Sequence, residues 1–595
     1  MNKKELLLVT TALEETWGVD EDILFLGEWC RGYLRREKYE CRKHEVLCHH
    51  WNDRKKLETD ESNLRRLHDE ILVAMTSVLN EVHDVNFSKR YWQIIIDPWL
   101  VSYVAVIFDR WESVRVVLDE YEVTKTFSLD ANLNIKVPRD YSTSIELYRS
   151  DLWNHHLFLD ILNQNLVTSC EVIPLNTSSV ANTGTIPNVT FDPKSLKWRV
   201  VYFLDKVLGK IANDSVAFFA GQIFPFATQI RLQISLGQVP HFNFALAKDR
   251  RPKYILSKKP LRQKASLLLR DNLLTKDSFE SFLIKRIFYD APSHLFEDYD
   301  ALRRIALVNK SYPRSIVSCY NHWSSEPFKI WSAERVEQGA KLLTVEHGGS
   351  LHPRFNSMDF ESDISDKKLV WCQPYGSNQV RLPAAKIVGG RLLNLKKGSG
   401  RWCLIIGYEN SRYVTRANAN PHGEQCLVMY SSILNLIENI SDDDLKTSIK
   451  IRPYPNMGWD LKARFVDELG VNCIQNDLKL YKAYEQAKVI VCTYPNTSFA
   501  EGMVSGQPTI LFYQKLFWEL DDHFKPILNI LRRAKIVHDD PVSLSKHLDE
   551  IWSDPELWWS SSKVLQAREA FNDMAISVPK DAIQTWIKFF KYEKN

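Results

Sequence analysis

In the second half of the chain, short apolar segments alternate with segments of helical periodicity, and this pattern constrains the fold more than any other feature. A strand that is apolar along its whole length is typical of a parallel sheet covered on both faces. Strands that alternate with helices of about 10–15 residues predict βαβ units. From about residue 310 onward we therefore expect parallel strands over 315–319, 340–345, 368–371, 385–388, 402–406, 448–452, 489–493 and 509–512.

The first half of the chain has fewer signals of this kind. The run Glu5–Thr11 predicts a buried strand, and amphipathic helices dominate the residues after it. We expect an α/β protein made of two doubly wound, Rossmann-type lobes that face a central cleft. The expected divisions are a lobe with helical insertions over residues 1–360, a Rossmann-like lobe over 361–553, and C-terminal helices over 554–595 that pack back on the first lobe.

The charge balance excludes some classes of partner. The 77 Lys and Arg residues nearly match the 74 Asp and Glu residues, so nothing indicates binding to nucleic acid. The most apolar stretch, 91–108, contains Gln93, Asp97 and Pro98, so we expect a buried element that breaks and restarts there. We expect no transmembrane segment, although attachment at a membrane surface stays open.

The cysteines point to a reducing compartment. Several of the ten lie in apolar strands, where a thiol acts as a small hydrophobe, and no secretory signal opens the sequence. We therefore expect a cytoplasmic protein. A group of zinc-ligand residue types lacks a Cys-x-x-Cys pair, so no metal site is expected there. These residues are Cys30, Cys41, His44, Cys48, His49 and His50.

A His-Gly-Gly sequence follows one of the expected strands directly. Glu346, His347, Gly348 and Gly349 come at its carboxyl end, where open α/β sheets bind ligands. The glycines let the backbone approach a ligand closely, and the histidine can act as acid, base or phosphate donor. A plain turn with a surface histidine would give the same pattern.

A second strand-end segment has the composition of an anion site. Asn496, Thr497 and Ser498 open a helix directly after the strand 489–493, with Glu501 one turn later. Free amides at a helix start bind phosphate, although the same residue types also serve as caps alone.

A third strand ends at Arg452, followed by Tyr454. The arginine can pair with a phosphate or carboxylate and the tyrosine can stack on a base. The segment from Arg412 to Arg416 is a weaker cationic cluster, for which a solvated loop is the favoured interpretation.

The loop after the first strand carries Thr11, Glu14, Glu15 and Trp17. Its position at a strand end makes it a candidate binding loop, with Glu14 as a candidate catalytic carboxylate. The same two glutamates could equally be ordinary charges at a helix start. The sequence has no Walker loop and no Gly-x-Gly-x-x-Gly, and its Asp-x-Asp triples do not follow strands directly. We expect no cofactor and no catalytic metal.

Together these pieces resemble a family of bacterial transferases found with O-antigen and surface-polysaccharide genes. The matching segments are 8–17, 25–30, 92–99, 346–349, 451–454 and 493–501, with the Trp558–Trp559 region at the far end. The His-Gly-Gly loop also looks like that of the retaining β-Kdo transferases, a more distant similarity.

The resemblance implies a GT-B glycosyltransferase. Its donor would be a CMP-linked ulosonic acid, such as Kdo or a sialic-like acid, and its acceptor a glycan or lipid-linked glycan at the cytoplasmic face of the inner membrane. His347 would lie at the reacting centre. Gly348, Gly349, Arg452, Tyr454, Asn496, Thr497, Ser498 and Glu501 would bind the donor, and Thr11, Glu15 and Trp17 would lie on the acceptor side.

A retaining route would need a carboxylate nucleophile. The sequence departs from the Kdo enzymes here, because the stretch 319–327 has no Asp; Glu326 or Glu346 are the substitutes. Two alternatives stand beside the transferase: a sugar-nucleotide epimerase or hydrolase of the same architecture, and a non-catalytic scaffold of a polysaccharide assembly complex.

Overall fold

The computed structural model describes residues 6–129, 137–165, 171–175, 196–209, 211–212, 214–243, 254–255, 259–272, 278–396 and 400–592. Within these residues the chain forms three five-stranded sheets, each parallel throughout, and a small antiparallel pair of β5 (Val137–Pro138) and β8 (Tyr254–Ile255). The parallel α/β architecture that the alternation predicts is confirmed.

The N-terminal sheet has the order β3-β2-β1-β4-β6. Its strands are β1 (Leu6–Val9), β2 (Asp22–Phe25), β3 (His44–Val46), β4 (Val123–Leu129) and β6 (Glu171–Leu175). The middle sheet has the order β12-β11-β10-β9-β7. Its strands are β7 (Ala217–Ala220), β9 (Ser315–Ser318), β10 (Lys341–Val345), β11 (Lys367–Val370) and β12 (Gln379–Arg381).

The C-terminal sheet has the order β14-β13-β15-β16-β17. Its strands are β13 (Trp402–Ile406), β14 (Ile449–Arg452), β15 (Ala487–Cys492), β16 (Thr509–Phe512) and β17 (Val537–His538). The helices that alternate with them are α14 (Gln425–Glu438), α15 (Asp443–Ser448), α16 (Leu461–Leu469), α17 (Leu480–Gln486), α18 (Thr497–Ser505), α19 (Lys525–Arg533) and α20 (Pro541–Ile551). The apolar strands of this region are buried, which explains why the alternation predicts them well.

The N-terminal half thus holds more sheet than the sequence predicts. The expected boundary at residue 360 falls inside the middle sheet, because β11 and β12 come after it. The apolar run 385–388 is a turn and not a strand. Ala385 and Ile387 are buried there, and a short apolar run has the same pattern whether it is a buried strand or a buried turn.

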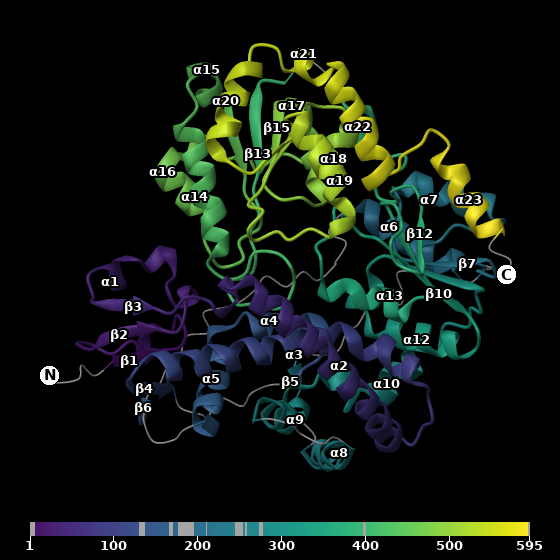
Figure 1. The fold of residues 1–595 in the computed structure, drawn as a ribbon. Coiled ribbons are helices and arrows are strands. Elements are labelled where there is room, and N and C mark those ends of the chain that lie inside the picture. Colours follow the sequence, from purple (N-terminus) through teal and green to yellow (C-terminus); the bar gives the residue numbers. More distant parts are fainter. Residues whose placement is uncertain are drawn as a thin grey trace.

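Two long helices join the N-terminal and middle sheets. Figure 1 shows α2 (Arg54–His83) and α3 (Lys89–Glu120) between these sheets and below the C-terminal sheet. The helices that pack against them are α4 (Tyr141–Tyr148), α5 (Asp151–Asn165), α8 (Lys259–Asn272), α9 (Ser278–Asp290), α11 (Asn321–Ser324), α12 (Glu326–Glu337) and α13 (Phe360–Ile364). The other helices before β11 are α1 (Glu37–Glu40), α6 (Leu196–Leu208), α7 (Phe226–Ser235) and α10 (Tyr299–Ala306). One apolar core runs from β1 and β2 through α2 and α3 to α12.

Helix α3 corrects one expectation. It runs without a break through Pro98, where the sequence predicts a break. Pro98 leaves the carbonyl of Ile94 without its helical donor, and the buried Lys329 ammonium donates to the next carbonyl, that of Ile95, at 3.3 Å. Among the described helices, α3 is long and apolar enough to cross a membrane, but 83% of its most apolar window is buried inside the fold. That burial is typical of a core helix.

The C-terminal helices divide between two sheets. Helices α21 (Pro555–Trp559) and α22 (Ser562–Ala575) contribute Trp559 and Phe571 to a core with strands β13, β15 and β16. Helix α23 (Ala582–Tyr592) returns to the middle sheet, where Trp586 and Phe590 pack with strands β7, β9 and β10. The chain end thereby lies beside β7 (Figure 1).

Candidate functional site

The His-Gly-Gly loop of the middle sheet touches the start of α18 from the C-terminal sheet. A Cβ built on Gly348 would lie 2.1 Å from Thr497 Oγ1, so only glycine leaves room for this contact. The loop follows β10 and the helix follows β15, and both are therefore at the carboxyl ends of parallel strands. The structure thus brings together two segments that the sequence identifies separately.

Glu346 anchors this loop. Its side chain is buried: Oε2 accepts a hydrogen bond from the Trp371 amide at 2.7 Å, and Oε1 contacts His352 Nε2. His352 Nδ1 in turn lies 2.8 Å from the Tyr375 hydroxyl. A Cβ on Gly349 would come within 2.6 Å of Glu346 Oε1, which accounts for the second glycine.

Backbone strain adjoins the same loop. Ser350 follows Gly349 with a φ of +127°, a conformation that L residues rarely adopt, and its buried hydroxyl has no hydrogen-bond partner among the described residues. Strain of this kind gathers at ligand sites.

His347 is exposed at the tip of the loop. Its Nδ1 lies 3.6 Å from Cys319 Sγ, and its ring centre lies 5.5 Å from that of Tyr320. Partial burial and then the Lys386 ammonium lower the pKa of His347, so its imidazole is neutral at pH 7. Burial raises the pKa of the Cys319 thiol to about 12, so the thiol stays protonated.

The start of α18 presents open amides. Asn496 is the N-cap residue, but its side chain makes no capping bond. The first amides of a helix have no carbonyl one turn earlier, so those of Thr497 and Ser498 point outward. The Ser498 hydroxyl bonds the Tyr494 hydroxyl at 2.6 Å. Glu501 is buried and pairs with Lys386 at 3.0 Å, which ties the helix to the segment after β12.

Arg452 and Tyr454 lie at the adjoining edge of the C-terminal sheet. Arg452 Nη1 donates to the Leu478 carbonyl at 2.8 Å and contacts Gln475 Oε1 at 3.3 Å, so part of its guanidinium holds a local chain segment. Tyr454 is 40% exposed, and its ring centre lies 5.8 Å from that of Tyr408.

Glu326 is not presented to the loop. It is fully buried at the start of α12, where it pairs with Lys329 at 2.7 Å and His294 at 3.2 Å. Burial raises the pKa of Glu326 to about 7. The expectation that it serves as a nucleophile is corrected by this position, because a carboxylate enclosed by protein partners cannot reach a substrate.

The four residues of the first loop lie at the end of β1, in the N-terminal sheet. Thr11 and Trp17 are buried, and the Trp17 indole donates to the Thr11 carbonyl at 3.3 Å. Although burial opposes the effect, hydrogen bonds from Lys38 and Arg35 lower the pKa of Glu14. Glu15 is exposed. Packing therefore explains the positions of Thr11 and Trp17, and ion pairing explains that of Glu14.

The sequence did not predict a buried chain of hydrogen-bonded side chains beside the loop. Ser318 Oγ lies 2.9 Å from His322 Nδ1, and His322 Nε2 lies 2.9 Å from Glu361 Oε1. Burial opposes it, but Lys368 and then His322 bring the pKa of Glu361 down to about 2. All three side chains are buried, so this hydrogen-bonded chain holds the end of β9 against α11 and α13. The strand-end position of Ser318 was the only signal that could have revealed it.

The one group of described side chains with metal-ligand geometry is His49, His50 and Asp109. His49 Nε2 and His50 Nε2 lie 3.0 and 3.2 Å from the same Asp109 oxygen. His49 Nδ1 accepts a hydrogen bond from the Trp51 amide, and His50 Nε2 makes a hydrogen bond with Asp109. The contact of His49 Nε2 with Asp109 has an ion-pair distance without hydrogen-bond geometry, and Arg110 pairs with the other Asp109 oxygen at 2.6 Å. Protein partners therefore account for the Asp109 carboxylate. Of the zinc-ligand types in the sequence, only His49 and His50 belong to this group.

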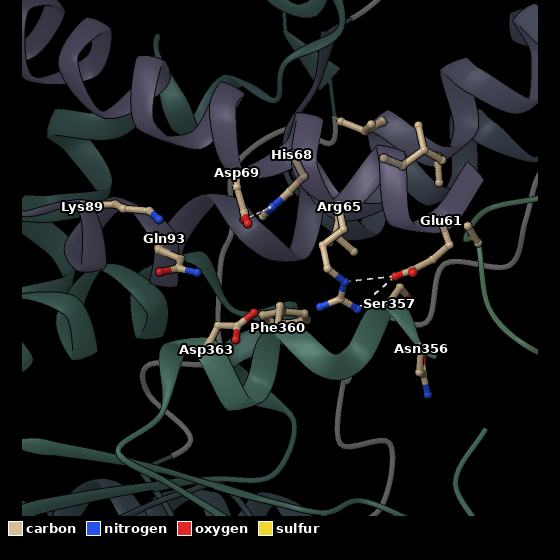
Figure 2. Close-up of a pocket in the computed structure, with 15 residues that line it drawn as sticks. Glu61, Arg65, His68, Asp69, Lys89, Gln93, Asn356, Ser357, Phe360 and Asp363 are labelled. Atoms are coloured by element: carbon tan, nitrogen blue, oxygen red, sulfur yellow. Dashed lines mark hydrogen bonds and ion pairs between the residues drawn. The ribbon is translucent and has the colours of Figure 1, made fainter. Parts of the chain in front are cut away.

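A separate pocket lies between α2, α3 and α13 (Figure 2). Its volume is about 440 Å³, and Figure 2 shows Arg65, His68, Lys89 and Asp363 around it. None of the predicted site residues lines it.

Comparison with known proteins identifies a family whose model covers almost the whole chain. The model of the LIC12162 family transferases matches residues 6–590. No curated protein matches. Among solved structures, the crystal structure of MurG from Acinetobacter baumannii is similar with a TM-score of 0.30 and 11% identity, over 63% of this chain and 97% of that chain. Because the family model spans nearly the full length, the chain belongs to the LIC12162 family of transferases.

Proposed function

We propose that this transferase is a glycosyltransferase of GT-B type that moves a sugar from a nucleotide donor to a bacterial surface glycan. The observation that carries the proposal is the contact between the His-Gly-Gly loop and the start of α18, with no room for a Cβ at Gly348. A site at which strand ends of two Rossmann-like sheets meet can hold a nucleotide on one side and a reacting sugar on the other.

The open amides of Thr497 and Ser498 support a donor with a phosphate. Lys386, which pairs with Glu501 and acts on the charge of His347, lies between this helix start and the His-Gly-Gly loop. We propose a CMP-linked ulosonic acid as the donor, because a phosphate and a sugar carboxylate would both suit a cationic site. Neither a metal nor an organic cofactor enters this proposal, since Glu346 and Glu501 are both engaged by protein partners.

His347 is proposed as a hydrogen-bond donor to the leaving phosphate. The protonated Cys319 thiol can donate to Nδ1, which places the imidazole proton on Nε2. Neither Glu346 nor Glu326 supports the retaining route, because both oxygens of Glu346 are engaged and Glu326 is enclosed. The acceptor is proposed to be a glycan or lipid-linked glycan at the cytoplasmic face of the inner membrane.

A thermal-shift screen with CMP, UDP, GDP and ADP tests the donor. We expect CMP alone to raise Tm, since a ligand at one hundred times its Kd adds about 2.7 kcal/mol to stability. Gly348→Ala should abolish this shift, whereas Gly32→Ala, at a glycine with open space around it, should keep it.

Release of CMP from a CMP-sugar should then depend on added acceptor. Release without acceptor would favour a hydrolase or epimerase. A shift with UDP or GDP would keep the glycosyltransferase and overturn the ulosonic donor. No shift with any nucleotide, together with no release, would contradict the proposal.

A further inference from the structure

Helix α6 turns an apolar stripe outward. Five side chains at helical spacing on α6 and the turn after it are each between 44% and 68% exposed. They are Val200, Phe203, Leu204, Val207 and Ile211, and we call them the α6 face. A surface helix of a globular protein normally turns such a stripe toward the core and its charges toward water. The α6 face is the reverse of that arrangement, and a contiguous exposed apolar surface marks an interaction site.

The opposite face of α6 is fixed to the middle sheet through a charged residue. Asp205 is buried, and its side chain accepts a hydrogen bond from the Phe242 amide. The Phe242 carbonyl accepts a hydrogen bond from the amide of Gly221, the residue after β7, at 2.9 Å. The Phe242 ring also stacks on that of Phe226, the first residue of α7, with ring centres 5.0 Å apart. Because these contacts hold Asp205 inward, the apolar stripe is turned outward.

These contacts attach α6 to the edge of the middle sheet that also carries the His-Gly-Gly loop. Phe242 meets the chain at the carboxyl end of β7, and the loop follows the carboxyl end of β10. Strand β9 lies between β7 and β10, so two strand spacings of about 5 Å each separate the two points. Figure 1 shows α6 beside α7 and close to the middle sheet. A partner bound at the α6 face is therefore on the same side of the sheet as the loop.

The charge of the segment indicates which partner suits it. Its one acidic residue, in the sequence from 196 to 211, is Asp205, which is turned inward. The basic residues of the same sequence are Lys197, Arg199, Lys206 and Lys210. An amphipathic helix with aliphatic and aromatic residues on one face and many Lys and Arg residues is typical of binding to an anionic bilayer surface. A second copy of the chain would bring the same positive charges together, which disfavours a dimer at this face.

We propose that α6 docks the protein on a membrane surface that contains anionic lipid. The apolar stripe enters the head-group region, and the negative charge of the lipids attracts the basic segment. This inference deepens the proposed function and rests on it for the lipid-linked acceptor. Docking through α6 would hold the His-Gly-Gly loop near the head group of such an acceptor.

Sedimentation with lipid vesicles tests the docking. We expect the full-length protein to bind vesicles of phosphatidylglycerol and phosphatidylethanolamine, and to bind pure phosphatidylcholine vesicles about tenfold more weakly or less. High salt should release it from the anionic vesicles, because screening weakens the attraction. No binding to the anionic vesicles would overturn the proposal. Equal binding to both kinds of vesicle would overturn the preference for anionic lipid.

A double variant assigns the binding to the α6 face. Leu204→Ser with Val207→Ser removes two apolar side chains from the stripe, so binding to anionic vesicles should weaken about tenfold or more. Val308→Ser with Leu557→Ser is the matched control, because it changes an exposed valine after α10 and an exposed leucine in α21. The control should bind as wild type does. Equal binding by the two double variants would overturn the α6 face as the docking surface.

Two measurements without lipid test other occupants of this face. The Tm of Leu204→Ser with Val207→Ser should match that of wild type, because both side chains are exposed in the folded protein. A lower Tm would show that another part of the chain covers the stripe. Analytical ultracentrifugation should give the same mass for the variant and wild type. A wild-type dimer that the variant loses would assign the face to a second copy, and either of these results would overturn lipid docking.

The outcomes stay distinct from those of the proposed function. The double variant at the α6 face should lose vesicle binding and keep the CMP-dependent Tm shift. If wild type does not bind vesicles but shows the CMP shift and acceptor-dependent release, docking is overturned and the glycosyltransferase stands. If vesicle binding depends on the α6 face while no nucleotide gives a shift and no release occurs, docking stands and the glycosyltransferase is refuted.

Discussion

At the scale of single residues, steric space explains the composition of the His-Gly-Gly loop better than charge does. The sequence predicts His347, Gly348 and Gly349 as a group because they follow an apolar strand. It cannot predict which atoms contact these glycines, because Thr497 reaches Gly348 only where two sheets meet, and Glu346 reaches Gly349 only through the local turn of the loop. For the same reason Glu326 resembles a catalytic candidate in sequence and is a buried ion-pair member in the structure.

Gly348→Ala should push the loop away from α18. The added Cβ would meet Thr497 Oγ1 at 2.1 Å, and such overpacking costs about 1–3 kcal/mol. We expect lower stability in urea unfolding and a large loss of transfer activity. Adding Thr497→Ala should recover part of both, since it removes the closest atom. No recovery in the double variant would contradict the contact as the cause.

The pH dependence of activity should reflect a neutral His347. Burial and then the Lys386 ammonium lower the pKa of His347, so activity that needs the neutral imidazole should be near its maximum at pH 8 and reach half of it only below pH 6.5. The pH profile of kcat/KM checks this. His347→Gln keeps a hydrogen-bond donor and should remove the acid limb while retaining some activity. A limb that rises between pH 6.5 and 8 would contradict the assignment.

At the scale of elements, the sequence predicts best where strands are buried on both faces. Strands β13, β14, β15 and β16 are recovered to within two residues at each end, whereas β2, β3, β4, β6, β12 and β17 were not predicted. Most of these are short, and β4 is only partly buried. Helix α3 shows how tertiary packing overrides a local signal, because its buried surroundings keep it helical through Pro98. The polar contacts of α2, which include the ion pairs of His68, have no sequence signature beyond helical spacing.

Lys329→Met should destabilise the fold by about 3–5 kcal/mol, because it leaves the buried Glu326 carboxylate without its ammonium partner. The variant also removes the donor to the Ile95 carbonyl in α3. Combining it with Glu326→Gln should cost less than Lys329→Met alone in urea unfolding. Glu326→Gln by itself should retain transfer activity. A folded but inactive Glu326→Gln protein would restore the nucleophile assignment.

His68 in α2 should make stability depend on alkaline pH. Burial opposes protonation, but Asp97 and Asp69 raise the pKa of His68 from 6.5 to about 9. Its contribution is therefore complete below pH 6.5 and is lost as pH rises through 9, for a total of about 3 kcal/mol. Unfolding of wild type and His68→Gln at pH 6 and 9.5 should show a gap that narrows at high pH. A gap of constant size would contradict the shift.

At the scale of the whole molecule, polar contacts tie the helical region to the C-terminal sheet. Arg54, at the start of α2, makes a two-pronged pair with Glu519 at 2.6 and 2.7 Å and also contacts Gln425. The sequence could not reveal this pair, because the partners are far apart and belong to no motif. It also could not separate the two sheets of the N-terminal half, whose strands are scattered among long helices.

Reversing the charge of Arg54 should destabilise the protein, and reversing the charge of Glu519 as well should recover stability. Arg54→Glu should cost about 1.5–3 kcal/mol, since it places two carboxylates together in a half-buried place. Adding Glu519→Arg should recover much of that loss, as measured by urea unfolding and by activity. A double variant no better than the single variants would show that Arg54 acts through Gln425 and the Asn420 carbonyl instead.

The contact between Gly348 and Thr497 also bears on how the protein matures. The two residues come from separate sheets and from distant points of the chain, so their contact closes a long loop, which is slow and entropically costly. Each sheet can acquire its helices and strands before that closure. We therefore expect the nascent chain to form most of its helices and strands before the His-Gly-Gly loop meets α18, so that this contact forms only when the C-terminal sheet docks.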